Sequence, residues 1–202
     1  MKTSWSYKVP FLSKYWTKRG IPEYRDFMIK KITELLEKNP HWKILDAGCG
    51  TGLMFKYLPE WAKENYTGID FTFEMIEYCK KNYPEYSDRF FRGNILEPDI
   101  IPSSDIIATQ NVIQHILLYQ QAIKNLVEKT RSILILCERT HNEPTIIFGY
   151  DPVRWRFREE DMLGCLKFYG DKYGFSFPTV IAHPKSTENL ENVIAIYMMV
   201  KE

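Results

Sequence analysis

A glycine-rich turn between two apolar segments constrains the fold of this chain more than any other feature. Residues 46–52 read DAGCGTG; they follow the apolar run 43–45 and precede the amphipathic run 53–58. Glycine adopts backbone angles that are closed to other residues and has no Cβ to keep a ligand away, and the start of the following helix is positively polarised. The order strand, turn, helix therefore predicts a loop that holds a nucleotide-like molecule close to the main chain.

The spacing of the glycines narrows the kind of ligand. It is Gly-x-Gly-x-Gly after an acidic residue, whereas loops that bind a dinucleotide pyrophosphate have Gly-x-Gly-x-x-Gly, so a less anionic ligand is expected. A second strand-like run, 66–70, ends in Asp70 about 20 residues after the glycines. There a carboxylate can accept hydrogen bonds from both hydroxyls of a ribose. The alternative is a structural turn followed by an Asp that caps a helix over 72–75.

Size and charge indicate one ordinary globular domain. The chain has 202 residues, of which 45% are hydrophobic and 26% charged, and its formal net charge is +1. This near-neutral balance predicts neither nucleic acid nor membrane as a partner. The sequence starts without an apolar signal segment and has no run of about 18 apolar residues, so a cytoplasmic location is expected.

The cysteines and histidines are scattered. Four cysteines stand far apart and form no Cys-x-x-Cys pair, and the four histidines are equally dispersed. This pattern indicates neither a disulfide scaffold nor a zinc site, and the apolar neighbours of Cys137 favour buried, inert thiols.

Hydrophobic periodicity predicts alternating strands and helices. A helical pattern starts at Ile21-Pro22, after an aromatic arm. The expected strands are 43–48, 66–70, 89–93, 105–110 and 132–137, and the expected helices are 52–62, 72–82, 119–129 and one near 158–173. Strand-like runs 178–182 and 192–197 are too close together for a crossover helix, so they should pair antiparallel. The fold class expected is a Rossmann-like, doubly wound α/β sheet of seven strands, mostly parallel, with helices on both faces and a C-terminal antiparallel hairpin.

In its glycine turn and in Asp70, the chain resembles the class I S-adenosylmethionine-dependent methyltransferases. Residues 46–52 match the first motif of that family, and Asp70 matches its second, acidic motif. The resemblance covers about residues 40 to 200 and implies S-adenosyl-L-methionine as the cofactor and a small molecule as the partner. Together with the chain length, it leads to the expectation of a single methyltransferase domain over 1–202, with an N-terminal aromatic and helical arm at 1–39, a cofactor-binding core at 40–138, and a substrate loop, helix and closing strands at 139–202.

The resemblance assigns roles to particular residues. The glycines let the backbone approach the methionine portion and the ribose, Asp46 positions the ammonium group, and Asp70 takes the ribose hydroxyls. Phe71 and Met75 cover the adenine, with core packing as the alternative. The full set expected to bind the cofactor is Asp46, Gly48, Gly50, Gly52, Asp70, Phe71, Met75, Asn94, Ile95 and Gln110.

The third strand is followed by a departure from the family pattern. Where the family usually has an acidic residue that accepts a hydrogen bond from the adenine amino group, this chain has Asn94. An amide oxygen can accept the same bond, and Ile95 offers a backbone N–H to the ring. The alternative is that Gly93-Asn94 is only a turn.

His115 and Glu138 are the candidate catalytic residues. The run 112–116 resembles a helix opening in small-molecule and protein N-terminal methyltransferases, where a His faces the acceptor. Imidazole titrates near neutrality and can remove a proton from a hydroxyl or amine, although it could equally hydrogen-bond the backbone and hold the loop. Glu138, at the end of the fifth strand, could polarise an acceptor or could be a surface carboxylate paired with Arg139.

The remaining candidates contact the substrate. In the arm, Tyr15, Trp16 and Arg19 could close over cofactor and acceptor, with plain packing as the alternative, and His141 is a weaker candidate. No metal is expected, because a metal-dependent site would need carboxylates at the ends of the fourth and fifth strands and the fourth ends in Gln110.

The resulting functional hypothesis is methyl transfer to an O or N atom of a small hydrophilic metabolite, such as a sugar or natural-product intermediate. The alternatives are a protein N-terminal amine methyltransferase and a non-catalytic, methyltransferase-like binding subunit. A nicotinamide oxidoreductase is disfavoured by the glycine spacing. The oligomeric state is left open.

Overall fold

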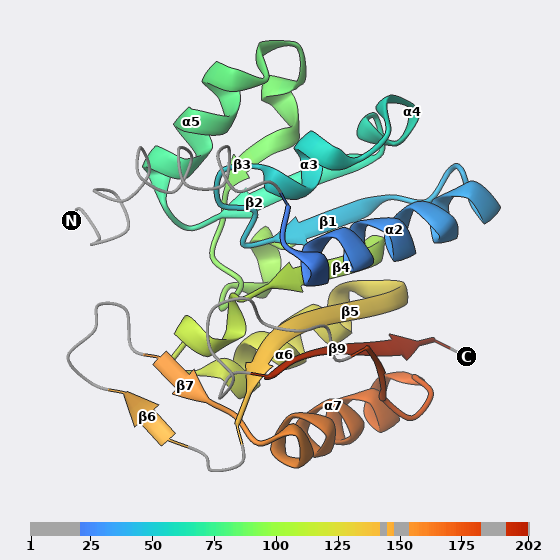
Figure 1. The fold of residues 1–202 in the computed structure, drawn as a ribbon, viewed down its shortest axis with the longest axis vertical. Coiled ribbons are helices and arrows are strands. Elements are labelled where there is room, and N and C mark those ends of the chain that lie inside the picture. The colour runs from blue at the N-terminus through green and yellow to red at the C-terminus, as the bar shows by residue number, and fades with distance from the viewer. Residues whose placement is uncertain (1–20, 142–144, 148–153, 183–192, 202) are drawn as a thin grey trace.

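The computed structural model describes residues 21–141, 145–147, 154–182 and 193–201. The strands of its main sheet are β1 (Ile44–Ala47), β2 (Tyr66–Asp70), β3 (Phe90–Arg92), β4 (Ser104–Gln110), β5 (Thr130–Thr140), β8 (Thr179–Ala182) and β9 (Val193–Val200). These seven strands lie in the order β3-β2-β1-β4-β5-β9-β8 (Figure 1). The five strands from β3 to β5 are parallel, and β9 is antiparallel to both of its neighbours, which confirms the predicted sheet and closing hairpin.

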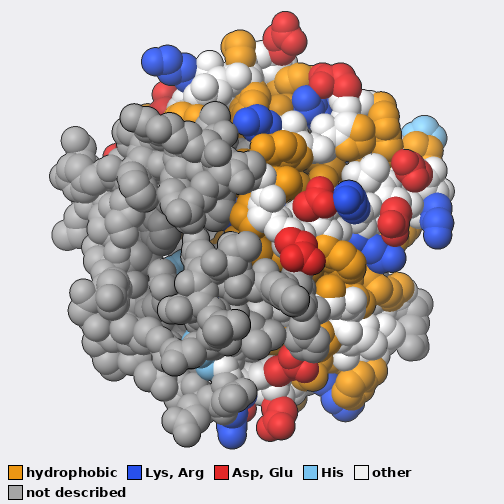
Figure 2. Space-filling view, in the orientation of Figure 1, with side chains coloured by type: hydrophobic (Ala, Val, Ile, Leu, Met, Phe, Trp, Pro, Cys, Tyr) orange, Lys and Arg blue, Asp and Glu red, His pale blue; other side chains and the backbone are white. Residues whose placement is uncertain are grey.

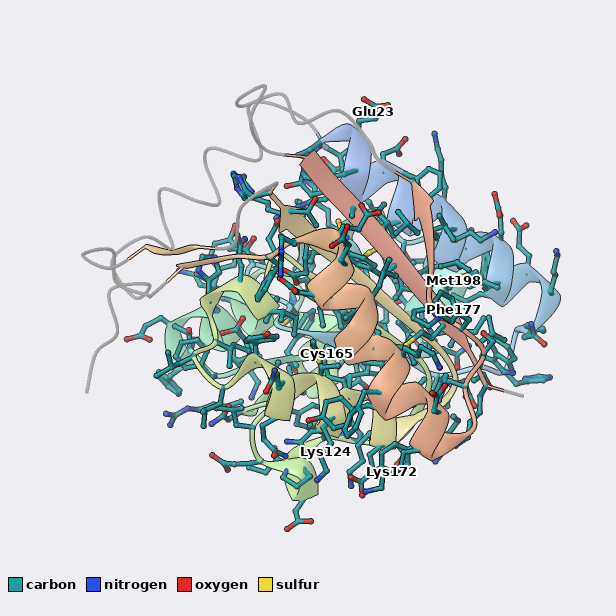
Figure 3. All side chains as sticks on the ribbon, turned by 90° about the horizontal axis from the view of Figure 1, so that it is seen from below. Glu23, Lys124, Cys165, Lys172, Phe177 and Met198 are labelled. Carbon is teal, nitrogen blue, oxygen red and sulfur yellow. The ribbon has the colours of Figure 1, made fainter. Side chains whose placement is uncertain are left out.

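Helices cover both faces of the sheet. They are α2 (Glu23–Lys38), α3 (Leu53–Tyr57), α4 (Glu60–Lys63), α5 (Phe73–Asn82), α6 (Tyr119–Lys129) and α7 (Glu159–Tyr173). Three short 3₁₀ helices, η2 (Pro84–Arg89), η3 (Pro98–Ile100) and η4 (Ile113–His115), lie in the connections. One face carries α2, α3 and α5, and the other carries α6 and α7. In Figure 3, α7 runs beside β9, with Cys165 on the helix and Met198 on the strand.

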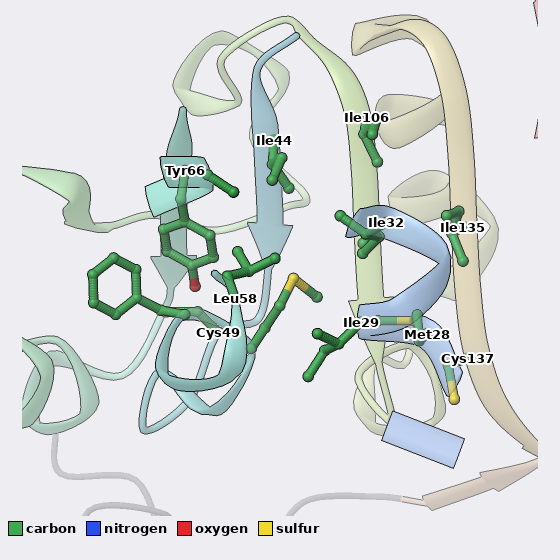
Figure 4. Packing of buried hydrophobic residues seen from close by; sticks show 14 of the residues in the cluster. Met28, Ile29, Ile32, Ile44, Cys49, Leu58, Tyr66, Ile106, Ile135 and Cys137 are labelled. Carbon is green, nitrogen blue, oxygen red and sulfur yellow. The ribbon is translucent and has the colours of Figure 1, made fainter. Parts of the chain in front are cut away.

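The two hydrophobic cores follow the alternation of side chains along the strands. On β5, Ile133, Ile135 and Cys137 pack in the core beneath α2, whereas Leu134 and Leu136 pack in the core beneath α6 and α7. Figure 4 shows the first core, where side chains of α2 meet those of β1, β4 and β5. Because successive residues of a strand point to opposite faces, the residues that end β5 are also divided between the two sides.

Some element boundaries differ from the prediction. The helix expected over 52–62 is interrupted at Leu58, whose extended backbone (φ −64, ψ 142) precedes Pro59. The ring of a proline disfavours helical angles at the residue before it, so the segment becomes α3 and α4. The fifth strand extends to Thr140 because β9 pairs with it along that length. The part of 139–202 expected to form the substrate loop includes two short strands that pair antiparallel, β6 (Thr145–Ile147) and β7 (Arg154–Arg156).

The surface and the thiols agree with the composition. On the described part of the face in Figure 2, Lys and Arg side chains are interspersed with Asp and Glu. Cys49, Cys79 and Cys137 are buried free thiols, and Cys165 is half-buried. None of the helices in the described ranges has the length and apolar character needed to cross a bilayer.

Candidate active site

A cavity of about 550 Å³ lies where the carboxyl ends of β1, β2 and β4 meet. The topology explains its place, because the chain crosses over at this edge between neighbouring parallel strands and leaves a crevice there. Nine of the ten residues predicted to bind the cofactor line the cavity, and Gly52 is the exception. His115 also lines it. The volume is within the range of small-molecule sites.

The three glycines have three different functions. Gly48 has φ +87, and a Cβ there would lie 2.4 Å from Cγ2 of Val112. The turn after β4 therefore packs this closely only because position 48 is a glycine. Gly50 has φ +53, and a Cβ there would meet nothing within 4 Å, which leaves open space for a ligand beside its backbone. Gly52 has φ +73 and faces Tyr83 at 3.0 Å, so it serves aromatic packing rather than the cavity.

Asp70 connects the glycine turn to the end of β2. Its Oδ2 accepts a hydrogen bond from the Gly50 backbone nitrogen at 3.0 Å, and its Oδ1 accepts one from the Thr72 backbone nitrogen at 2.9 Å. Burial raises the pKa of the Asp70 carboxyl, and these two N–H groups oppose the rise. The bond to Thr72 spans two residues, so it forms a local turn rather than a cap of α5. Each oxygen keeps a lone pair for a further donor.

Asp46 is the second buried carboxylate of the site. It is 3% exposed, and its Oδ2 accepts a hydrogen bond from the Tyr66 hydroxyl at 2.9 Å. Burial raises the pKa of Asp46 to about 7, while the Tyr66 hydrogen bond and the charge of Arg25 act in the opposite direction. A buried carboxyl with this pKa gains from a cation placed beside it.

The residues predicted to contact the adenine line the cavity, and one of them also forms a turn. Asn94 Oδ1 accepts a hydrogen bond from the Leu96 backbone nitrogen at 3.1 Å, and Asn94 Nδ2 donates to Glu97 Oε1 at 3.1 Å. Asn94 therefore stabilises a turn and also lines the cavity. Phe71 is 48% exposed, whereas Met75 is 4% exposed, so the alternative of core packing applies to Met75 better than to Phe71.

Glu138 is bound by the backbone of the segment that follows β4. Its Oε1 accepts hydrogen bonds from the backbone nitrogens of Val112 and Ile113, both at 3.0 Å. The Gln114 backbone nitrogen lies 3.4 Å from Oε2, and the Thr109 hydroxyl donates to Oε1 at 3.3 Å. The side chain is fully buried, so the alternative of a surface carboxylate is wrong. Burial raises the pKa of Glu138 to about 7 against these donors.

These contacts assign Glu138 to holding η4 in place. It is not among the described residues that line the cavity, so direct contact with an acceptor remains a prediction that its position does not favour. His115, at the end of η4, does line the cavity, and its catalytic role stays a prediction. Asn111, just before this segment, has φ 55, a left-handed conformation that no other non-glycine residue adopts in the described ranges.

Reasoning from sequence did not assign several residues of the cavity lining, and three of them come from elements that it did not connect with the site. Tyr24 and Arg25, from the start of α2, and Arg139, from the end of β5, line the cavity. The helical period that starts at Ile21-Pro22 carried no information on which strand ends that helix reaches. The Tyr24 hydroxyl accepts a hydrogen bond from Asn111 Nδ2 at 3.3 Å, which joins α2 to the turn after β4.

None of the residues predicted to contact the substrate is among the described residues that line the cavity. Tyr15, Trp16 and Arg19 lie outside the described residues. His141 is described, and its backbone nitrogen donates to the Phe157 oxygen at 2.8 Å, but it is not one of the described cavity-lining residues. In the described part of the chain, no three His, Cys, Asp or Glu side chains are grouped so that they could hold a metal ion.

Comparisons with known proteins agree with this geometry. Residues 45–132 match the family model described as a methyltransferase domain. A malonyl-[acyl-carrier protein] O-methyltransferase from Acetivibrio thermocellus is 25% identical over 163 residues, which cover 72% of this chain and 58% of that protein. The chain thus matches little more than half the length of this relative.

Solved structures share the fold across nearly the whole chain. The magnesium protoporphyrin IX methyltransferase from Synechocystis PCC 6803, solved with bound SAH, has a TM-score of 0.70 at 14% identity and covers 99% of this chain and 96% of its own. The sugar N-methyltransferase KedS8 from Streptoalloteichus has a TM-score of 0.67 at 12% identity and covers 95% of this chain and 92% of its own. At these identities the likeness concerns the fold.

Proposed function

Since residues 45–132 of this protein match the methyltransferase-domain family model and its sheet has the fold of solved methyltransferases, we infer that it transfers a methyl group from S-adenosyl-L-methionine. The acceptor atom is an oxygen or nitrogen of a small hydrophilic metabolite, such as a sugar or natural-product intermediate. When bound, the cofactor supplies a methyl group on a positively charged sulfur, which an acceptor lone pair can take.

One observation carries this inference. Two buried carboxylates, Asp46 and Asp70, lie at the carboxyl ends of adjacent parallel strands, and Asp70 accepts a hydrogen bond from Gly50, beside whose backbone there is open space. This arrangement fits an amino acid ammonium group at Asp46 and ribose hydroxyls at Asp70, because charged acceptors form the stronger hydrogen bonds. Phe71 and Asn94, farther along the lining, supply an apolar surface and a polar edge for a base.

Polar neutral side chains support a hydrophilic acceptor. Gln110, Asn111 and Gln114 line the cavity on the side of the β4 carboxyl end, and His115 lies with them. In this arrangement His115 accepts the proton that an acceptor hydroxyl or amine releases, and the amides orient the acceptor. Glu138 acts through the backbone of η4, which it holds in place.

Calorimetry tests the proposal directly. We expect the purified protein to bind S-adenosylmethionine and S-adenosylhomocysteine at sub-millimolar concentration and to melt at a higher temperature when either is present. Asp70→Ala should weaken that binding, and it should also lower stability because Gly50 and Thr72 lose their acceptor. Binding of NAD but of neither adenosyl compound would overturn the proposal.

The matched control is Asp99→Asn, on the exposed helix η3. This variant removes a carboxylate of the same kind that is not among the described residues lining the cavity. We expect it to bind S-adenosylhomocysteine as the wild type does. A control that binds as weakly as Asp70→Ala would show that net charge, rather than the site, governs the affinity.

A further inference from the structure

We propose that the acceptor is a small organic carboxylate and that the guanidinium group of Arg139 binds its carboxylate. This inference rests on the proposed methyl transfer, since it names the class of acceptor. It adds a specificity-determining residue, which comes from the end of β5 and which reasoning from sequence considered only as a surface partner of Glu138.

Strand order separates Arg139 from the two acidic residues of the cavity lining, because β4 lies between β5, which carries Arg139, and β1. In the described part of the chain, the acidic lining residues are Asp46 and Asp70, which end β1 and β2. The lining residues that can carry positive charge are Arg25, Arg139 and His115, from α2, β5 and η4. The two carboxylates suit the cationic and hydroxyl-bearing parts of the cofactor, and Arg139, on the far side of β4 from them, is placed for an anionic acceptor.

Side chains of β5 point alternately to the two faces of the sheet, so Arg139 lines the cavity and Glu138 does not. Glu138 and Arg139 are successive residues, so their side chains point to opposite faces of the sheet. Glu138 is buried on its own face by hydrogen bonds from the backbone of 112–114. The end of β5 therefore contributes a cation to the cavity lining without contributing the adjacent carboxylate.

The two arginines converge, but they have different neighbours. Burial and the charge of Glu138 raise the pKa of the Cys137 thiol, and the nearby charges of Arg25 and Arg139 oppose this rise. The charges that act on the Asp46 pKa are those of Arg25 and Asp70. Arg25 therefore lies near the predicted ammonium site, whereas Arg139 follows the point of β5 where Cys137 pairs with Gln110 at the end of β4.

The chemistry of a guanidinium group selects a carboxylate. It is planar, keeps its charge at all working pH values, and presents paired N–H donors that match the two oxygens of a carboxylate. The neutral amides of Gln110, Asn111 and Gln114 can bind the rest of a polar acceptor but cannot compensate a negative charge. Among the lining residues of β4, η4 and the end of β5, Arg139 is therefore the group whose loss should weaken the binding of an anionic acceptor most.

Binding of simple dicarboxylates tests this inference without turnover. Malonate, succinate and glutarate are titrated by calorimetry into wild-type protein, with and without saturating S-adenosylhomocysteine, and malonamide, succinamide and glutaramide serve as uncharged probes of matched shape. We expect at least one dicarboxylate to bind with a dissociation constant below about 10 mM, a weak but specific affinity. The corresponding diamide should bind at least about tenfold more weakly, as expected for loss of a charged hydrogen-bond partner.

Variants on one strand make the test specific. Arg139→Gln should weaken dicarboxylate binding about tenfold or more, and Arg139→Lys should fall between this variant and the wild type because it keeps the charge and loses the planar fork. Arg131→Gln, an exposed arginine at the other end of β5, should bind as the wild type does. Melting temperatures of all three variants report whether each is folded.

The outcomes separate this inference from the proposed function. Equal dicarboxylate affinity in wild type and Arg139→Gln, equal affinity for diamides, or no dicarboxylate binding to wild type would overturn the carboxylate assignment. If wild type binds S-adenosylhomocysteine in that case, the proposed methyl transfer stands. If dicarboxylates bind through Arg139 but neither adenosyl compound binds, the anion site stands and the proposed methyl transfer fails.

Discussion

The Oε1 oxygen of Glu138 lies 3.0 Å from the backbone nitrogen of Ile113, and this buried hydrogen bond joins the end of β5 to the start of η4. The Val112 backbone nitrogen is at the same distance from the same oxygen. The Glu138 carboxylate therefore holds the segment that places His115 in the cavity lining, although Glu138 and His115 are far apart in sequence.

Replacement of Glu138 tests this link. Glu138→Gln keeps the shape but presents an amide NH₂ group to backbone donors, so at least one N–H loses its acceptor. Leaving such a group unsatisfied costs about 1–3 kcal/mol. We expect a lower melting temperature and lower turnover, with a smaller change in affinity for S-adenosylhomocysteine. Glu77→Gln, on the exposed side of α5, is the control. Unchanged stability in Glu138→Gln would contradict the holding role.

Two alanine variants distinguish the functions of the glycines. Gly48→Ala brings a Cβ within 2.4 Å of Cγ2 of Val112, so it should displace η4 and destabilise the fold. The Cβ of Gly50→Ala meets nothing within 4 Å, so the only cost to the fold is the positive φ, about 1–2 kcal/mol. The added methyl group instead occupies space that the ligand would use. We expect Gly48→Ala to lose more stability and Gly50→Ala to lose more cofactor affinity relative to its stability. Equal losses in both measurements would refute the distinction.

The pKa of Asp46 predicts how cofactor affinity depends on pH. Burial raises that pKa from 3.8 to about 7, so protonation below this pH removes the negative charge that a bound ammonium group needs. Calorimetry with S-adenosylhomocysteine should show affinity rising from pH 6 to pH 8, by up to about tenfold per unit below the pKa. Asp46→Asn should bind weakly and with a flat profile, and a steep profile in that variant would contradict the assignment.

The same shift has a consequence for the protein without ligand. Because the folded pKa is higher than the unfolded one, the folded state holds more protons between pH 3.8 and about 7. The contribution of Asp46 to stability is therefore present at low pH and decreases as the pH rises through this window. Denaturant titrations of wild type and Asp46→Asn measure this contribution. As the pH rises toward neutral, the wild type should lose stability relative to Asp46→Asn.

His115 is the remaining prediction about chemistry. His115→Ala should lower turnover about 10²- to 10⁴-fold if the imidazole acts as general base, with cofactor affinity nearly intact. The pH–rate profile of the wild type should have a limb that the variant lacks. Equal turnover in both proteins would end this assignment, and a joint loss of activity, stability and cofactor affinity would indicate that His115 holds the loop.

Local sequence patterns determined the architecture and the cofactor side of the cavity. Helix and strand periods alternate along the chain, and short connections allow few ways to join strands into one sheet. The glycine turn and Asp70 follow two strands that such a fold must place side by side, so their proximity could be predicted before any coordinates. The same reasoning placed the final two strands in an antiparallel pair.

The acceptor side was decided only by the tertiary structure. Whether Glu138 is buried and Arg139 faces the cavity depends on the register of β5, where Gln110 pairs with Cys137, and on which face α2 covers. A shift of one residue would exchange the two side chains between the faces of the sheet, because the period of a strand is two. Adjacent residues of opposite charge carry no sequence signal that tells which of them points into the cavity. Long-range strand pairing and helix packing make that choice.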